Sequence, residues 1–342
     1  MNTSITIADT EVLPGEKKTI NVPLPDLYTS TDINMPVHVI NGKEAGPRLF
    51  VSAAIHGNEI NGVEIIHRLL NLPEISSLKG TLVAIPVVNV YGFISQSRYL
   101  PDRRDLNRSF PGSSKGSMAS RLAHLFTNEI IKQCTHGIDL HTAAIGRTNL
   151  PQIRAELSFS MEIKKMACAF GSPVVMDTKK LLPGSIRETA HKNGVPVLLY
   201  EAGEALRFNE VSITAGVSGV IGVMQFLEML EPDGSHCDIS KKPLLASSSN
   251  WVRAPQSGIL RAVANLGTHV EEGEVIGIIS DPFGDNEEKV LASACGIIIG
   301  RTKLPLLYEG EACFHIAHFH EPSGVLKAIE ALHNQHGNPD QE

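Results

Sequence analysis

The chain has 342 residues, which exceeds the usual size of one domain, so two domains are expected. Its composition, 42% hydrophobic and 20% charged, is that of a globular protein, and its net charge of −7 argues against a general binder of nucleic-acid phosphates. The chain does not open with basic residues followed by an apolar segment, and no apolar run approaches ~20 residues, so neither a signal peptide nor a membrane span is predicted.

The cysteines are widely spaced and form no Cys-x-x-Cys pair. An odd, scattered set is typical of reduced thiols rather than of a disulfide framework. We therefore expect a cytoplasmic protein. The five residues are Cys134, Cys168, Cys237, Cys295 and Cys313.

Strand-like and helix-like patterns alternate over the first two thirds of the chain. Short β-like pieces around residues 18–22 and 36–40 come first, and residues 49–55 and 81–88 are apolar runs typical of strands buried on both faces. Helical spacing begins near Glu59. Residues 91–116 are expected to form a long loop of functional importance. Further helices are predicted at 117–134, 157–169, 184–192 and 209–230, and further strands at 138–141, 172–176 and 195–200.

This alternation predicts an α/β fold with a mixed, largely parallel sheet and helices on both faces. We expect residues 1–231 to form this domain and residues 232–250 to be a polar linker. Residues 251–320 contain two rounds of glycine turn and strand, which resemble the barrel-sandwich domains of biotinyl and lipoyl carriers. The loop holding Lys289 is longer than a carrier hairpin, so no swinging-arm function is predicted. A C-terminal tail or short helix, 321–342, completes the chain.

Two side chains at the end of the strand 49–55 have the spacing of metal ligands. His56 and Glu59 stand in the sequence HGNE, where a strand passes into a helix, and ligands of α/β sheets collect at such positions. An imidazole and a carboxylate are donors that Zn²⁺ accepts near ~2 Å. The pair alone is short, and an ordinary acidic residue in a first helical turn remains the alternative.

A third candidate ligand, His141, ends the predicted strand 138–141. Two histidines and one glutamate would leave a fourth position open for water, as in catalytic zinc sites. Asp139 lies two residues before His141 on the same strand face and could orient a ring or a nearby loop. A hydrogen-bonded histidine at a strand end remains the alternative for His141.

Glu201 follows the strand 195–200 and is a candidate general base toward a zinc-activated water. Glu204 competes for this role, and a solvated strand-end glutamate is the alternative. Cationic groups come from the long loop, with Arg98, Asn107 and Arg108, and from a second stretch with Arg147 and Arg154. Arginine pairs with carboxylates and opposes a developing oxyanion, although such clusters also occur on solvated loops.

Four segments in this order, HGNE, DLNRSFPG, DLHT and the strand-end Glu201, resemble the succinylglutamate desuccinylase/aspartoacylase family, relatives of the zinc carboxypeptidases. The resemblance covers roughly residues 48–230, and the C-terminal β domain resembles the family's usual appendage. It implies a carboxypeptidase-like fold and one Zn²⁺ per subunit on His56, Glu59 and His141.

The same resemblance implies Glu201 as the base. It also implies Arg98, Asn107 and Arg108 as groups that polarise the acyl carbonyl or hold the substrate's carboxylate. For a further arginine on the substrate's carboxylate, Arg147 and Arg154 are the candidates.

Three other clusters could imitate a metal site. Glu64 with His67, and Glu188 with His191, have the Glu-x-x-His spacing of di-iron bundles, but this chain lacks a four-helix pattern, so both pairs are read as helix-surface residues. His315, His318 and His320 are read as exposed histidines at a strand end rather than as ligands.

The sequence therefore predicts a zinc-dependent deacylase that hydrolyses the amide of a small N-acyl amino acid or acylated amine. A metallocarboxypeptidase acting on peptides and a non-catalytic, metal-dependent binding protein are the alternatives. A small-molecule substrate is expected, without nucleic-acid or membrane partners. The acyl group, the amine and the choice between monomer and homo-oligomer stay open.

Overall fold

The computed structural model describes residues 1–232, 245–320 and 322–336. Most of the predicted linker, residues 233–244, and the last residues of the predicted tail, 337–342, lie outside the described residues. Within the described part of the chain, no helix is both long enough and apolar enough to cross a membrane.

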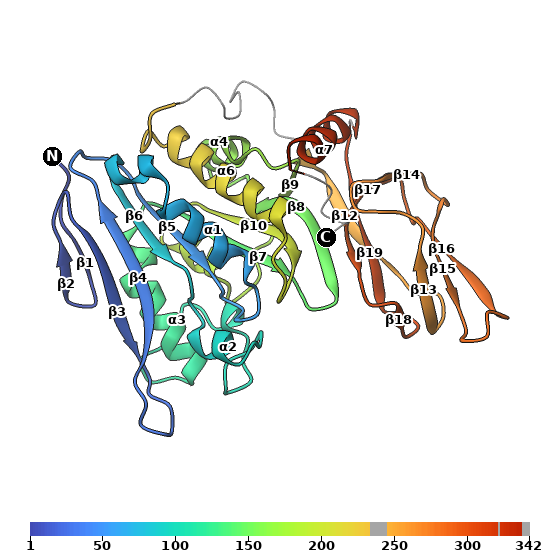
Figure 1. Cartoon of the computed structure of the whole chain (residues 1–342), viewed down its shortest axis with the longest axis horizontal. Helices are drawn as coiled ribbons and strands as arrows, with labels where there is room; N and C mark the ends of the chain where they lie inside the picture. The colour runs from blue at the N-terminus through green and yellow to red at the C-terminus, as the bar shows by residue number, and fades with distance from the viewer. Residues whose placement is uncertain (233–244, 321, 337–342) are drawn as a thin grey trace.

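One large mixed sheet organises the molecule (Figure 1). At its centre, β10, β7, β5 and β6 run parallel to one another, while β4 and β8 pair antiparallel on either side. In order across the sheet, the main strands are β12 (Ser248–Arg253), β19 (Ala312–His318), β17 (Gly296–Thr302), β8 (Arg147–Ala155), β10 (Val197–Glu204), β7 (His136–Ala143), β5 (Arg48–Ala53), β6 (Thr81–Ile85), β4 (Ile33–Asn41) and β3 (Lys17–Leu24).

Helices cover both faces of this sheet, as predicted, because neighbouring strand residues point to opposite sides. In β5, Leu49 belongs to the hydrophobic cluster under α1 (Asn61–Leu70), α4 (Met161–Phe170) and α6 (Glu210–Phe226). The next residue, Phe50, belongs to the cluster under α2 (Val90–Ile94), α3 (Met118–Glu129) and α5 (Ile186–Lys192). The expectation of a mixed α/β fold is confirmed.

The second cluster is centred on Phe126 of α3. Its ring meets the rings of Phe50 and Phe110 edge to face, with centroids 6.0 and 5.9 Å apart. Such contacts add about 0.5–1.5 kcal/mol each to the burial of the rings. This packing holds the loop around Phe110 against the sheet, and that loop carries part of the site described below.

Side-chain caps start several of the helices where the sequence placed them. Ser117 accepts a hydrogen bond from the backbone N–H of Ser120 at the start of α3, and Ser185 and Asn209 cap α5 and α6 in the same way. Each cap satisfies a backbone donor that the helix leaves free and contributes about 1 kcal/mol.

The C-terminal strands form their own core but also extend the large sheet. β17 pairs antiparallel with β8, with Gly300 opposite Asn149. Behind these strands lies a four-stranded sheet, in the order β16 (Glu287–Leu291), β15 (Val275–Ser280), β13 (Gly258–Ala262) and β18 (Leu306–Leu307). Three short strands complete the pairings: β9 (Val174–Asp177) on β8, β11 (Leu245–Ala246) on β9 and β14 (His269–Val270) on β17.

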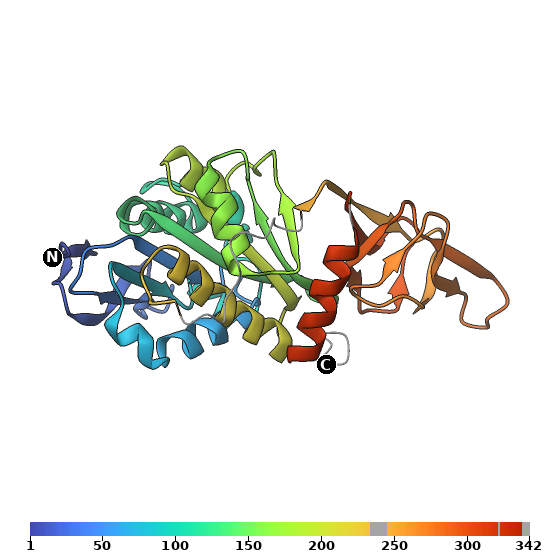
Figure 2. The same ribbon diagram turned by 90° about the horizontal axis from the view of Figure 1, so that it is seen from above.

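The helix α7 (Pro322–His336) lies within the segment predicted as a tail or short helix. Figure 2 shows it crossing between the α/β part and the C-terminal strands of an elongated molecule. Val325 and Ile329 of α7 join the core of those strands, and the helix also contacts α6. The helix therefore ties the two parts of the chain together.

The structure differs from the sequence-based expectations at a few elements. Residues 147–155, a cationic stretch in the sequence, form the buried strand β8, in which Pro151 and several polar residues hide the strand pattern. The predicted loop 91–116 includes the short helix α2, capped by the Asn89 side chain, and the single turn η2 (Leu106–Arg108). The N-terminal pair β1 (Ile5–Ile7) and β2 (Thr10–Val12) was not predicted.

Candidate functional site

His56, Glu59 and His141 meet at one edge of the sheet. His56 Nδ1 lies 2.7 Å from Glu59 Oε1, and His141 Nδ1 lies 2.8 Å from Glu59 Oε2. The two imidazole centroids are 5.1 Å apart. All three residues are at least 96% buried, and one ligand atom from each lies within 4.8 Å of the others. The residues singled out by the sequence are therefore in contact, although 82 positions separate two of them.

Strand pairing brings these residues together. β5 and β7 are parallel neighbours with Ala53 opposite Leu140, so the chain leaves β5 beside His141. The turn after β5 is tight: Ala54 has a positive φ of 51°, and a side chain at Gly57 would lie 1.9 Å from the backbone of Gly92. Only glycine fits that approach, which explains the glycine between His56 and Glu59.

A further carboxylate orients each histidine. His141 Nε2 lies 2.8 Å from Asp139 Oδ2, and Ser52 Oγ donates a hydrogen bond of 2.9 Å to the other oxygen of Asp139. His56 Nε2 lies 3.1 Å from Asp105 Oδ1. Each carboxylate favours a proton on Nε2, which leaves Nδ1 as the coordinating atom. Metal-binding histidines are commonly held in this way.

The electrostatics of this cluster favour a cation. Burial alone would lower the pKa of His56 and of His141, but Glu59, Asp105 and Asp139 outweigh it and raise both. Burial would raise the pKa of Glu59, yet the two imidazoles hold it far below its usual range. Two nitrogen donors, one ligating carboxylate and two supporting carboxylates make a donor set that fits Zn²⁺.

Glu201 lies beside this trio on the neighbouring strand. Residue 201 of β10 is opposite His141 of β7 in a parallel pair, so both side chains project from the same face of the sheet. Asn149 Nδ2 donates a hydrogen bond of 2.7 Å to Glu201 Oε2, and Arg154 NH2 lies 3.4 Å from the same oxygen. The carboxylate of Glu201 is therefore held from the β8 side.

Glu204, the competing candidate for the base, is engaged elsewhere. Its carboxylate accepts a hydrogen bond from the backbone N–H of Gly146 and pairs with Arg207. It is not among the described residues that line the cavity beside the trio. The geometry therefore favours Glu201.

The trio and Glu201 open into a cavity of about 260 Å³. Arginines dominate its wall, which indicates an anionic ligand. The lining residues are His56, Glu59, Arg98, Asn107, Arg108, His141, Thr142, Ala143, Ala144, Arg147, Asn149, Arg154, Leu182, Ser185, Arg187, Leu199, Glu201 and Trp251.

The structure places the predicted polar residues of the long loop in this wall. Arg98 NH1 lies 3.3 Å from Glu59 Oε1, and Arg98 NH2 lies 3.0 Å from Asp105 Oδ2. Asn107 Oδ1 accepts a hydrogen bond of 2.9 Å from the backbone N–H of Ile186, which docks the loop on the start of α5. Arg108 NH1 donates to the backbone carbonyl of Asn107. The loop is thus structured around the site.

The two arginines of the second cationic stretch lie on different sides of the cavity. Arg154 is next to Glu201, whereas the Arg147 guanidinium lies over the Trp251 ring, 5.2 Å from its centroid. Trp251 in turn stacks on His315 at 4.5 Å with an angle of 9° between the rings. The C-terminal strands therefore contribute an aromatic wall to the cavity.

Arg187 and Trp251 line the cavity but were not singled out by the sequence analysis. Arg187 stands in the first turn of α5 and is 8% exposed, and its NH1 has no hydrogen-bond partner. Burial, together with Arg154, lowers its pKa to about 10. The available signal was an arginine two residues after Ser185, in the first turn of a predicted helix. For Trp251, the signal was a lone tryptophan beside a linker.

The other histidine clusters are engaged in local contacts. Glu64 pairs with His67 and Arg68 on the surface of α1. Glu188 pairs with Lys192, and His191 pairs with Glu156. His315 and His318 contact different partners, Ser249 Oγ and Asn250 Oδ1. The prediction of exposed strand-end histidines is wrong for His315, which lies inside β19 and is buried because its ring stacks on Trp251.

The chain is similar to proteins of one known family. The model of the succinylglutamate desuccinylase/aspartoacylase catalytic domain matches residues 45–227. A deacetylase of N-alpha-acetyl-L-2,4-diaminobutyric acid from Halomonas elongata is 24% identical over 256 residues, which are 73% of this chain and 75% of the relative.

Solved structures show the same fold over most of the chain. A succinylglutamate desuccinylase/aspartoacylase from Rhodobacter sphaeroides has a TM-score of 0.79 at 21% identity and covers 89% of this chain and 96% of its own. The product-bound ectoine utilization protein EutE of Ruegeria pomeroyi has a TM-score of 0.80 at 20% identity. This match covers 93% of the present chain and 100% of the EutE chain.

Proposed function

The chain belongs to the succinylglutamate desuccinylase/aspartoacylase family, and we propose that it hydrolyses the amide bond of a small N-acyl amino acid or a similarly acylated amine. We further propose that His56, Glu59 and His141 hold one Zn²⁺. The observation that carries this proposal is the convergence of the three buried donors beside Glu201, at a cavity lined with arginines.

When bound, zinc lowers the pKa of a water molecule and acts as a Lewis acid that polarises the acyl carbonyl. Glu201 takes a proton from the attacking water and returns it to the nitrogen of the leaving amine. A C–O bond forms and the C–N bond breaks, so the products are a carboxylic acid and an amine. Asn149 keeps the Glu201 carboxylate in place for both proton transfers.

The arginines bind the substrate and oppose negative charge. Arg98 and Arg108, with Asn107, stand on the loop next to His56 and are suited to the carbonyl oxygen as it becomes an oxyanion. Arg187, with a free buried N–H, and the neighbouring Arg154 are suited to a substrate carboxylate. Arg147 on the Trp251 ring can contact a further polar group of the substrate.

A hydrolysis screen of the zinc-loaded protein tests the proposal. The relative from Halomonas elongata is named for an acetylated diamino acid, so this compound is the first to assay, followed by succinyl and longer acyl amino acids. Peptides with free C-termini are included, because a metallocarboxypeptidase would cleave these instead. Zinc-dependent ligand binding without turnover on any acyl amide would favour a non-catalytic protein and contradict the proposal.

Two variants separate the metal from the base. His141→Ala is expected to lose both zinc and hydrolysis. Glu201→Gln keeps the shape of the site, and it is expected to retain zinc but lose at least about 10²-fold in kcat. Metal content by elemental analysis and amine release by chromatography measure the two effects. Full activity in Glu201→Gln would assign the base to another residue.

We place the protein in the cytoplasm, because its five cysteines are scattered along the sequence without a Cys-x-x-Cys pair, which is typical of reduced thiols rather than of a disulfide framework. Fractionation of the source cells and a thiol titration of the extracted protein test this placement.

A further inference from the structure

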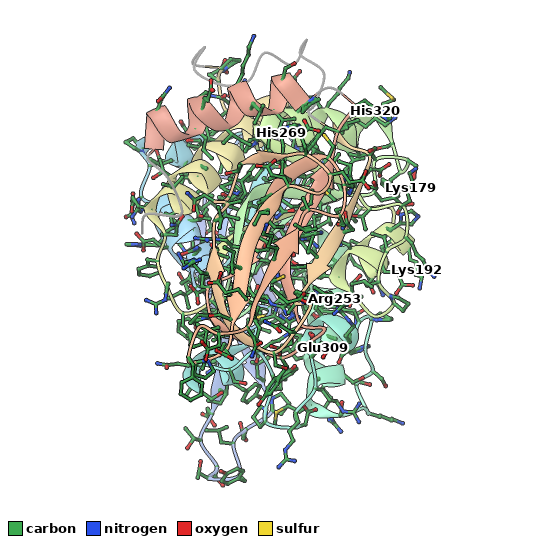
Figure 3. All side chains as sticks on the ribbon, turned by 90° about the vertical axis from the view of Figure 1, so that its right-hand side faces the viewer. Lys179, Lys192, Arg253, His269, Glu309 and His320 are labelled. Atoms are coloured by element: carbon green, nitrogen blue, oxygen red, sulfur yellow. The ribbon has the colours of Figure 1, made fainter. Side chains whose placement is uncertain are left out.

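A second group of metal-ligand side chains lies in the C-terminal β part. His269 belongs to β14, Glu271 follows that strand directly, and Cys295 stands in the turn before β17. Figure 3 shows His269 at the upper end of this part of the molecule, with Arg253 and Glu309 at the opposite end. None of the three residues belongs to the cavity described above.

The separations between these side chains suit a tetrahedral cation. Cys295 Sγ lies 3.5 Å from His269 Nε2. A Zn–S bond of ~2.3 Å and a Zn–N bond of ~2.0 Å, at a tetrahedral angle, separate sulfur and nitrogen by roughly 3.5 Å. Each of His269, Glu271 and Cys295 offers one ligand atom, and these atoms lie within 4.8 Å of one another. Glu271 Oε1 lies 3.8 Å from His269 Nδ1, the ring nitrogen other than the one that faces Cys295, so the exposed Glu271 side chain has to turn towards Nε2 to complete three ligands.

The backbone that carries the ligands is held from both sides. β14 pairs with β17, with Val270 opposite Gly296, so His269 and Cys295 are neighbours across two strands. His318 Nδ1 lies 2.8 Å from the Cys295 carbonyl oxygen and holds the turn from β19. Because this backbone is already fixed, binding a cation costs less conformational entropy than it would in a flexible loop.

We propose that His269, Glu271 and Cys295 form a second metal site, for Zn²⁺ or a cation of similar softness. The set combines a thiolate, an imidazole and a carboxylate, whereas the catalytic trio contains no sulfur, and soft ligands select zinc and its neighbours over Mg²⁺ or Ca²⁺. Binding releases the Cys295 thiol proton to solvent and joins β14 to β17. Water fills the remaining coordination position. The site is exposed, so it binds metal more weakly than the buried trio.

Cobalt titration of the full-length protein tests the proposal, because Co²⁺ takes zinc sites and a thiolate–cobalt bond absorbs in the near ultraviolet. The catalytic trio gives no such band. We expect the band to appear with the second equivalent of Co²⁺ and to disappear when Zn²⁺ is added. Cys295→Ser, a nearly isosteric change of an exposed side chain, is expected to remove the band completely. His269→Ala is expected to weaken cobalt binding by at least about tenfold.

Matched controls keep the experiment specific. His191→Ala removes another histidine that is paired with a glutamate but does not belong to the proposed site, so the band is expected to remain. Cys237→Ser, at a position outside the described residues, is also expected to keep it. His141→Ala abolishes the catalytic site but not the band, so failure of the proposed hydrolase and failure of this site are distinguishable. Absence of the band in the unmodified protein, or its persistence in Cys295→Ser, would overturn the proposal.

Discussion

Asn149 of β8 donates a 2.7 Å hydrogen bond to the Glu201 carboxylate of β10, and this amide is itself positioned by the C-terminal strands. Gly300 of β17 lies opposite Asn149, and a Cβ at that glycine would lie 2.7 Å from Asn149 Oδ1. The orientation of the proposed base, Glu201, therefore depends on Gly300, which lies about one hundred positions further along the chain.

Removing this amide should slow turnover without removing substrate or metal. In Asn149→Ala the Glu201 carboxylate loses its hydrogen-bond donor, and we expect kcat to fall about 10–100-fold while KM changes little, since misplacement of a catalytic group by 1 Å costs rates of this order. Steady-state kinetics and zinc content measure the effect.

Gly300→Ala should reproduce this loss from the other strand, because the new methyl group displaces the Asn149 amide. The double variant should then be no slower than Asn149→Ala alone, because both changes act on one contact. Additive losses would show that Gly300 acts on the base by another route.

The supporting carboxylate of His141 should control zinc affinity. Asp139→Asn replaces the acceptor on His141 Nε2 with an amide, and we expect the zinc dissociation constant to rise about 10–100-fold. Competition with a chelating dye measures it. Ser52→Ala, which removes only the hydrogen bond to Asp139, should have a smaller effect. An unchanged affinity in Asp139→Asn would argue against His141 as a ligand.

Arg187 should strengthen substrate binding while lowering the free energy of unfolding. The buried guanidinium of Arg187 has a nitrogen without a hydrogen-bond partner. Replacing Arg187 leaves Arg154 in its place next to Glu201. We expect Arg187→Met to raise KM for a carboxylate-bearing substrate at least about tenfold, which is the loss of one charged hydrogen bond. The same change should stabilise the fold by about 1 kcal/mol, since buried charges often cost stability.

Urea unfolding and steady-state kinetics test the two effects of this substitution together. The control Lys192→Met lies on the same helix but forms an exposed ion pair with Glu188, so its stability should change by less than about 0.5 kcal/mol and its KM should not change. A destabilised Arg187→Met with normal KM would give Arg187 a purely structural role.

The single tryptophan of the chain should report on ligand binding, because Trp251 lines the cavity and stacks with Arg147 and His315. We expect substrate or product to change the tryptophan emission of Glu201→Gln, which binds without turnover. The concentration dependence gives a dissociation constant. A ligand that binds by calorimetry but leaves the emission unchanged would place the ligand away from this wall.

His315 should make the fold sensitive to acid. Burial lowers its pKa to about 3, from 6.5 in the unfolded chain, with smaller contributions from Arg154 and His318. The unfolded state therefore binds the proton first, and stability is lost as the pH falls from 6.5 towards 3. At pH 5 the loss from this group is about 2 kcal/mol.

His315→Phe keeps a ring to stack on Trp251 and cannot be protonated. We expect the difference in unfolding free energy between pH 7.5 and pH 5 to be smaller in this variant, by about that 2 kcal/mol. Urea titrations at the two pH values measure it. An equal difference in both proteins would mean that His315 is protonated without unfolding.

Local patterns were sufficient for much of the fold and for the residues first singled out. The apolar strand before HGNE, the helical spacing after Glu59 and the strands that lead to His141 and Glu201 are all short-range signals, because period and turn residues are properties of neighbouring positions. The predicted ends of these two strands are too early, since β7 continues to Ala143 and β10 to Glu204. The short-range signals placed the trio and the acidic residue at one sheet edge. These local patterns did not predict β8, because this buried strand carries polar side chains that line the cavity.

The amino-acid sequence by itself determined the alternation of strands and helices and the chemistry of the four strand-end residues, since these depend on spacing along the chain. Only the tertiary structure decided that Arg187, Trp251 and Asn149 complete the cavity, and that His269 meets Cys295. The contacts of Asn149, Trp251 and His269 follow from strand register and strand pairing, and that of Arg187 from the packing of α5 against the loop at Asn107. All of these join residues distant in sequence and leave no periodic trace in it.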